Sequence, residues 1–195
     1  MHLSTVSNED KPYAEAANSY GSFNTWKNTL RAGTGLLNNR FTVDLRLSRI
    51  SSDGFIDRAS TSMQSYFVSA AYRHRRTDVR FTHFLGAERT YQAWYGVPER
   101  LLRTNRTFNP AGTEKPGAPY DNETDNYRQG HYQLAWTQRL NPQWVLNSTL
   151  FYVRGKGYYE QYKGVAAGDA IGSTSGTQYK TYGLPDVMIG GDTIT

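Results

Sequence analysis

The chain has 195 residues and a formal net charge of +5, from 22 Lys and Arg against 17 Asp and Glu. Only 37% of the residues are hydrophobic but 14% are aromatic, which argues against disorder because disordered chains are poor in aromatic side chains. The absence of Cys excludes disulfide bonds and thiolate metal sites. The mild charge, without a basic stripe or an RNA-binding motif, gives no reason to expect nucleic-acid binding.

Neither a membrane-spanning helix nor a signal peptide is predicted. No apolar run approaches the roughly 20 residues that a transmembrane helix needs. The first residues, MHLSTVSNEDK, lack a basic start and an apolar stretch. We therefore expect either a cytosolic protein or a piece of a longer precursor.

Strand periodicity recurs along the chain, whereas helical periodicity is hard to find. In FTVDLRLSRIS, residues 41–51, apolar side chains alternate with polar ones, as in a β-strand whose two faces meet different surroundings. The sequence predicts about seven such strands, at residues 13–20, 26–35, 41–51, 63–73, 78–88, 130–140 and 144–155.

The predicted connections differ in length. Residues 36–39, 74–77 and 141–143 form very short turns and residues 21–25 a short one. Residues 51–61 form a polar loop, and the Pro-rich region from Arg89 to Arg128 is long and irregular. Short turns at every second connection are typical of outer-membrane barrels, which have short periplasmic turns and long extracellular loops. A compact soluble domain rarely contains an irregular segment of this length.

Two interpretations of the apolar strand faces remain open. They pack into a core in a soluble β-sandwich, whereas in a transmembrane barrel they meet lipid, with Asp44 and Arg46 facing the lumen. Aromatic residues on the strands or near their ends would form interfacial girdles in a barrel: Trp26, Tyr72, Trp136, Trp144 and Tyr152. Three apolar residues break the alternation and fall on the polar face: Phe84, Phe151 and Val153.

Four stretches of the sequence together resemble one known family. They are SYGSFNTWKNTLRAGTGLLNNRFTVDLRLSRISSDGFIDRAS (19–60), TYQAWYGVPERLLRTNRTFNPAG (90–112), YDNETDNYRQGHYQL (120–134) and GKGYYEQYK (155–163). Together, over roughly residues 1–165, they resemble the first barrel strands of TonB-dependent outer-membrane receptors, especially ferric-siderophore receptors of Bacteroidetes-type bacteria. The resemblance implies an all-β fold, a partial antiparallel transmembrane β-barrel. Seven strands do not close, so we expect a fragment.

The resemblance also implies a function. Residues 1–10 would be the end of a plug domain, and residues 11–195 the N-terminal part of the barrel. The whole receptor would take up iron–siderophore complexes through the outer membrane of a Gram-negative cell. TonB–ExbB–ExbD would act as partner through the missing plug, and outer-membrane lipid and lipopolysaccharide would surround the barrel. Because no bond in the cargo breaks, the resemblance implies no catalytic residue and no cofactor.

The region from Arg89 to Arg128 is the candidate ligand-binding loop. It offers aromatic surface and positive charge, which suit anionic, aromatic iron complexes. The alternative is that these side chains pack the loop on itself or bind lipopolysaccharide phosphates. The candidate residues are Tyr91, Trp94, Tyr95, Arg100, Arg103 and Arg106.

Signatures of enzymes are not found in the sequence. It contains no GxSxG, P-loop or HExxH motif, and its four His residues lack metal-ligand spacing, so no metal site is predicted. Other functions remain open: the same barrel with cobalamin, another metal chelate or an oligosaccharide as cargo, a soluble all-β carbohydrate-binding module, or a barrel enzyme.

Overall fold

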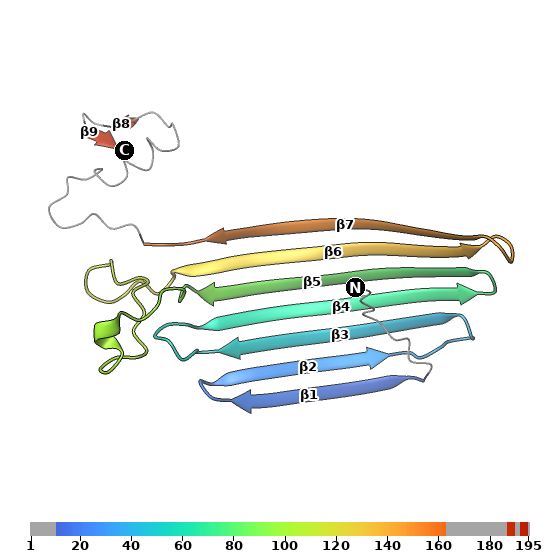
Figure 1. Ribbon diagram of the computed structural model, residues 1–195, viewed down its shortest axis with the longest axis horizontal. Helices are drawn as coiled ribbons and strands as arrows, with labels where there is room; N and C mark the ends of the chain where they lie inside the picture. Colours follow the sequence, from blue (N-terminus) through green and yellow to red (C-terminus); the bar gives the residue numbers. More distant parts are fainter. Residues whose placement is uncertain (1–10, 163–186, 190–191, 195) are drawn as a thin grey trace.

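A computed structural model describes residues 11–162, 187–189 and 192–194. Seven antiparallel strands form one sheet in sequence order (Figure 1). Their bounds are β1 Tyr13–Gly21, β2 Thr25–Gly33, β3 Phe41–Ser52, β4 Thr61–His74, β5 Thr77–Tyr91, β6 Thr124–Arg139 and β7 Val145–Tyr159. Two short strands, β8 Val187–Ile189 and β9 Asp192–Ile194, pair with each other, and η1, Glu99–Leu101, is a single turn of 3-10 helix.

The all-β prediction is confirmed, and each of the seven predicted strands is present. The predicted bounds of the long irregular region were wrong, because β5 continues to Tyr91 and β6 begins at Thr124. Thr124 lies directly opposite Tyr91, so pairing between strands extends both of them into a stretch whose local pattern is weak. The predicted end of a plug domain, residues 1–10, lies outside the described residues.

The two ends of the sheet carry different connections. Residues 22–24, 53–60 and 92–123 connect strands at one end, which we call the loop end (Figure 1). Residues 34–40, 75–76 and 140–144 connect them at the other, the turn end. Asn38 and Asn39, in the predicted turn, have φ of +48° and +53°, a left-handed conformation that Asn tolerates well. From β3 onward the loop-end connections are longer than the turn-end ones, as predicted, but residues 22–24 at the loop end form a shorter connection than residues 34–40 at the turn end.

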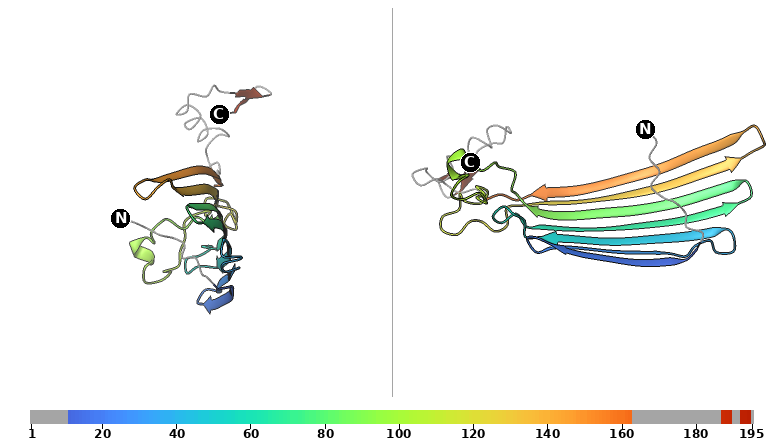
Figure 2. Two further views of the ribbon diagram at one scale, coloured as in Figure 1. Left: turned by 90° about the vertical axis from the view of Figure 1, so that its right-hand side faces the viewer. Right: turned by 60° about the horizontal axis from the view of Figure 1, so that its bottom comes forward.

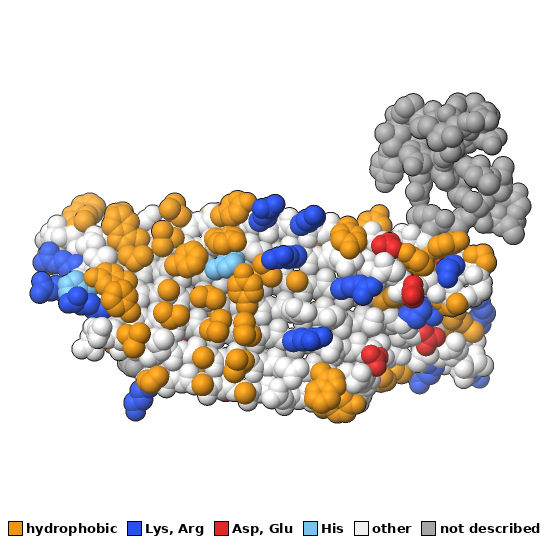
Figure 3. All heavy atoms as spheres, turned by 180° about the vertical axis from the view of Figure 1, so that it is seen from behind, with side chains coloured by type: hydrophobic (Ala, Val, Ile, Leu, Met, Phe, Trp, Pro, Cys, Tyr) orange, Lys and Arg blue, Asp and Glu red, His pale blue; other side chains and the backbone are white. Residues whose placement is uncertain are grey.

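The register defines two faces. Residues directly opposite each other share a face, and the pairing runs without interruption along neighbouring strands. We call the face that carries Asp44, Ser69, Thr82 and Gln133 the polar face. The other, which we call the apolar face, carries Leu45, Val68, His83 and Tyr132 in its central row and faces the viewer in Figure 3. Phe84, Phe151 and Val153 fall on the polar face, as predicted, and the register places further apolar residues there: Ile50, Met63, Phe67 and Val145.

The sheet is a single curved layer (Figure 2). Among the described residues, the only buried hydrophobic side chains are Ala71, Tyr91 and Ala111, and the latter two lie at the loop end. Large apolar side chains are exposed instead: Leu150 is 66% exposed and Phe151 is 76% exposed. An exposed apolar area of this extent marks a surface that meets a partner or a membrane.

Glycines in β7 leave room for an aromatic ring. Tyr127 of β6 lies opposite Gly157, and a Cβ atom at Gly157 would lie 2.6 Å from the Tyr127 ring and 2.9 Å from the Asn126 carbonyl oxygen. A Cβ atom at Gly155 would lie 2.8 Å from the Tyr127 hydroxyl. The ring therefore covers backbone that no side chain covers, a recognised way to stabilise glycine in a sheet.

We predict that Gly157→Val destabilises the β6–β7 pairing by about 1–3 kcal/mol, because the ring and the carbonyl must move apart. Gly86→Val is the matched control, since a Cβ atom there would meet nothing within 4 Å. The measurement is guanidinium unfolding of both variants in the same detergent. Equal midpoints for the two variants would contradict the prediction.

Candidate functional site

The loops at the loop end form one folded unit around Arg58. Its guanidinium Nη2 donates to the carbonyl oxygens of Asn109 at 2.6 Å and Ala111 at 2.9 Å, and Nε donates to the Tyr91 hydroxyl at 3.3 Å. The same guanidinium lies 5.7 Å from the Tyr91 ring centroid. Arg58 therefore joins the β3–β4 loop to the distant loop 92–123.

Asn109 completes this connection. Its amide donates to the carbonyl oxygens of Asp57 at 3.0 Å and Gln92 at 2.9 Å, and its side-chain oxygen accepts from the Ala111 N–H at 3.1 Å. Gln92 and Asn109 are almost completely buried. Because buried polar groups are stabilising only when they are hydrogen-bonded, this arrangement selects one loop conformation.

A third contact joins loop 92–123 to the residues that follow β7. The Tyr120 hydroxyl donates to the Glu160 carboxylate, and this hydrogen bond lowers the pKa of Glu160 and raises the pKa of Tyr120. Gln161 donates to the Gln92 side-chain oxygen at 2.8 Å. The loop region expected to be structureless is therefore held on several sides by polar contacts.

Five of the six predicted ligand-binding residues lie on the outside of this unit. Trp94 and Tyr95 are 64% and 53% exposed. Arg100 lies in η1, and Arg103 and Arg106 follow it in turns, with all three exposed. Tyr91 is different: it is buried, and its hydroxyl donates to the carbonyl oxygens of Ala111 and Tyr120.

The predicted set therefore divides into two roles. Tyr91 packs the loop on itself, which is the alternative interpretation raised from the sequence. The other five form an exposed aromatic and basic surface, which we call the loop-end surface: Trp94, Tyr95, Arg100, Arg103 and Arg106. Sequence reasoning missed Arg58 and Asn109, because their contacts join residues about fifty positions apart and leave no local pattern.

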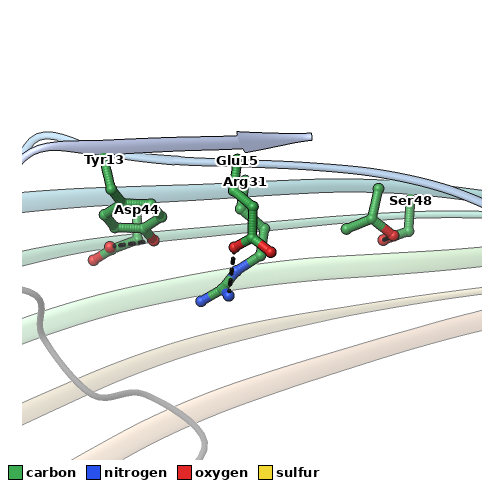
Figure 4. Close-up of polar contacts among 6 residues, drawn as sticks. Tyr13, Glu15, Arg31, Asp44 and Ser48 are labelled. Carbon is green, nitrogen blue, oxygen red and sulfur yellow. Dashed lines mark hydrogen bonds and ion pairs between the residues drawn. The ribbon is translucent and has the colours of Figure 1, made fainter. Parts of the chain in front are cut away.

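The polar face carries its own network across β1, β2 and β3 (Figure 4). The Tyr13 hydroxyl donates to Asp44 at 3.0 Å, and Arg31 forms an ion pair with Glu15 at 3.2 Å. The Arg31 guanidinium also lies 5.7 Å from the Tyr13 ring centroid. These charges are paired with each other, which leaves a hydrophilic surface without a cluster of free charges in this region.

Comparison with known proteins identifies no relative: no family model matches the chain, and neither a curated protein nor a solved structure does. In the described part of the chain, no group of His, Asp and Glu side chains is placed to hold a metal ion. Within the same residues, no helix has the length and apolar character needed to cross a membrane.

We predict that Arg58→Met loosens loop 92–123 by about 1–3 kcal/mol, because two buried carbonyl oxygens lose their donor. The measurement is hydrogen exchange of the loop amides. Arg103→Met, at an exposed position of the same loop, is the control and should leave the exchange rates unchanged. Equal protection in the two variants would show that Arg58 does not hold the loop.

Proposed function

We propose that the chain forms part of the wall of an outer-membrane TonB-dependent receptor that takes up iron–siderophore complexes. The observation that carries the proposal is that the acidic side chains of the sheet all lie on one of its two faces. In strands β1–β7, every Asp and Glu falls on the polar face by register: Glu15, Asp44, Asp78, Glu88 and Asp125. The apolar face carries none.

The distribution along the apolar face supports a lipid contact. From the row of Phe41 to the row of Leu47, this face carries mainly apolar side chains over roughly 20 Å at about 3.3 Å per residue. His83 packs against the Tyr132 ring within the band, and Arg154 lies in the row of Leu47 at its limit. An open sheet in water would gain nothing from exposing such a band, whereas lipid covers it without cost.

Aromatic side chains lie at the turn-end limit of the band and, toward the loop end, two rows beyond its limit, past a row that carries Arg49, Arg128 and Lys156. One row at the turn end contains Phe41, Tyr72 and Trp136. Another at the loop end contains Tyr20 and Trp26, with Tyr158 in the same row on β7. Ten residue steps separate the rows, roughly 33 Å along a strand, or roughly 25 Å along the axis of a barrel with a tilt of about 40°.

The rows agree with the predicted girdle in part. Trp26, Tyr72 and Trp136 lie in them. Tyr152 lies in the middle of the apolar face, opposite Tyr132, and Trp144 lies in the turn before β7. Strands of 12 to 16 residues, as in β3 to β7, exceed the roughly 9–11 residues needed to cross a bilayer and so reach beyond both limits.

The proposed cargo rests on the loop-end surface and on the resemblance seen in the sequence. The exposed rings of Trp94 and Tyr95 offer stacking surface, and three Arg side chains offer charge to an anionic complex. The folded unit around Arg58 fixes the backbone beneath them, which lowers the entropic cost of binding. TonB–ExbB–ExbD would be the energy-coupling partner.

The membrane part of the proposal predicts alternating surroundings along one strand. The chain has no Cys, so single Cys residues can carry spin labels without background. We expect labels at Leu134→Cys and Leu150→Cys to collide with oxygen, which partitions into lipid. Labels at the neighbouring positions Gln133→Cys and Thr149→Cys should collide with a water-soluble nickel complex. Equal contact of all four labels with the nickel complex would favour a water-soluble β-protein.

The cargo part is tested by binding of an anionic ferric catecholate to the full-length protein in micelles. We expect the double variant Trp94→Ala, Arg103→Ala to bind it roughly 10-fold more weakly, from the loss of one stacking and one charge-assisted contact. The control, Arg75→Ala with Arg76→Ala, removes charge at the turn end and should bind normally. If cobalamin or an oligosaccharide binds and the catecholate does not, the barrel keeps its proposed role with another cargo.

A further inference from the structure

A groove of about 480 Å³ lies on the apolar face near the β6–β7 edge. Its basic residues are Arg128, Arg154 and Lys156, and its aromatic residues are Tyr132 and Tyr152. Nothing in the proposed transport function uses this groove, because it opens on the side of the sheet opposite the polar face and away from the loop-end surface.

The cations of the groove lie at neighbouring positions of β6 and β7. Arg128 lies directly opposite Lys156, and Arg154 lies two residues from Lys156 on the same face of β7. All three side chains are exposed, and within the described residues none of them forms an ion pair or a side-chain hydrogen bond. Because the strands place no Asp or Glu on this face, the positive charge is not neutralised by the sheet itself.

Gly130 opens the space between these cations. It lies opposite Arg154, and a Cβ atom there would lie in ordinary contact with Leu85 Cδ1 at 3.7 Å and with His83 Nε2 and Tyr132 Cε2 at 3.9 Å. Gly130 is buried and lines the bottom of the groove, where a larger side chain would meet these neighbours. Its wall on the turn-end side is a run of rings, since Tyr132 stacks on His83 at 4.0 Å and lies 6.0 Å from Tyr152.

The apolar surface continues from the groove toward the turn end. Leu134 and Leu150 lie opposite each other in the next row, and both are exposed. A ligand with a negative head and apolar chains would thus place its head on the cations and its chains on the leucines. Guanidinium groups match phosphate oxygens in a two-point geometry, and Lys adds a point charge.

We propose that this groove binds a phosphorylated membrane lipid, with the phosphate held by Arg128, Arg154 and Lys156. The inference rests on the proposed membrane placement of the sheet. It adds a defined lipid site to a surface that would otherwise be a general contact with hydrocarbon. Long basic side chains at this height reach the headgroup region while their stems stay on apolar surface.

The test compares two lipids that differ only in the phosphate. The full-length protein in dodecyl maltoside micelles is titrated with dioctanoyl phosphatidic acid and with dioctanoylglycerol, and bound lipid is counted by native mass spectrometry. We expect phosphatidic acid to bind and dioctanoylglycerol to bind much more weakly. In the triple variant Arg128→Gln, Arg154→Gln, Lys156→Gln, affinity should fall roughly 100-fold, about a factor of five for each cation.

Two further variants separate the effect of the groove from the effect of net charge. Arg40→Gln, Arg75→Gln, Arg76→Gln removes the same charge at the turn end and should bind phosphatidic acid normally. Gly130→Leu keeps all three cations but fills the floor of the groove, so it should also weaken binding. The β-sheet band in far-UV circular dichroism checks that each variant is folded.

Several outcomes would overturn the inference. Equal loss in the two triple variants would make the effect one of net charge, and equal binding of the two lipids would make it apolar partition. Displacement of the lipid by millimolar inorganic phosphate would make the groove a site for the free anion. The spin labels separate the two proposals: lipid contact at Leu134 with no effect of the triple variant rejects only the groove, whereas water contact at Leu134 rejects the membrane placement itself.

Discussion

The uninterrupted backbone pairing of β1 to β7 is the constraint on which the rest of this structure depends. Successive side chains in a strand point to opposite faces, so one unbroken register assigns every strand residue to a face. A slip of one residue in β6 alone would move Arg128 and Trp136 to the polar face and carry Asp125 to the apolar one. The acidic side chains are therefore confined to the polar face only because the register holds across all six pairings.

The difference between the polar and the apolar face takes the place of a hydrophobic core in this sheet. Ordinary domains bury apolar side chains between two layers, but only three hydrophobic residues are buried among the described residues, and the sheet has one layer. The apolar face must then be covered by something other than the described strands. In the proposed membrane placement lipid would cover this face, and phosphate headgroups would meet Arg128, Arg154 and Lys156 at one side of the band only.

The loop end follows a different physical rule. There the chain is held by buried polar contacts rather than by strand pairing, and the guanidinium of Arg58 and the amide of Asn109 connect segments about fifty residues apart. These contacts bury little apolar surface, but each unsatisfied group would be costly, so they select one arrangement of the loop. The exposed rings of Trp94 and Tyr95 are carried on this fixed base. In the proposed function, this fixed base would give the loop-end surface the pre-organisation that a loop alone lacks.

The sequence by itself determined the strands, the alternation of their faces and the positions of the turns, because these depend on a period of two and on residues such as Asn38 and Asn39 that accept turn conformations. It also placed Phe84, Phe151 and Val153 on the polar face correctly. Only the tertiary structure decided where β5 and β6 end, that Tyr91 is a packing residue, and that Arg128, Arg154 and Lys156 share one groove. The physical reason is that these features depend on which residues lie opposite each other across strands or loops, and such contacts join positions far apart in the chain without leaving a local pattern.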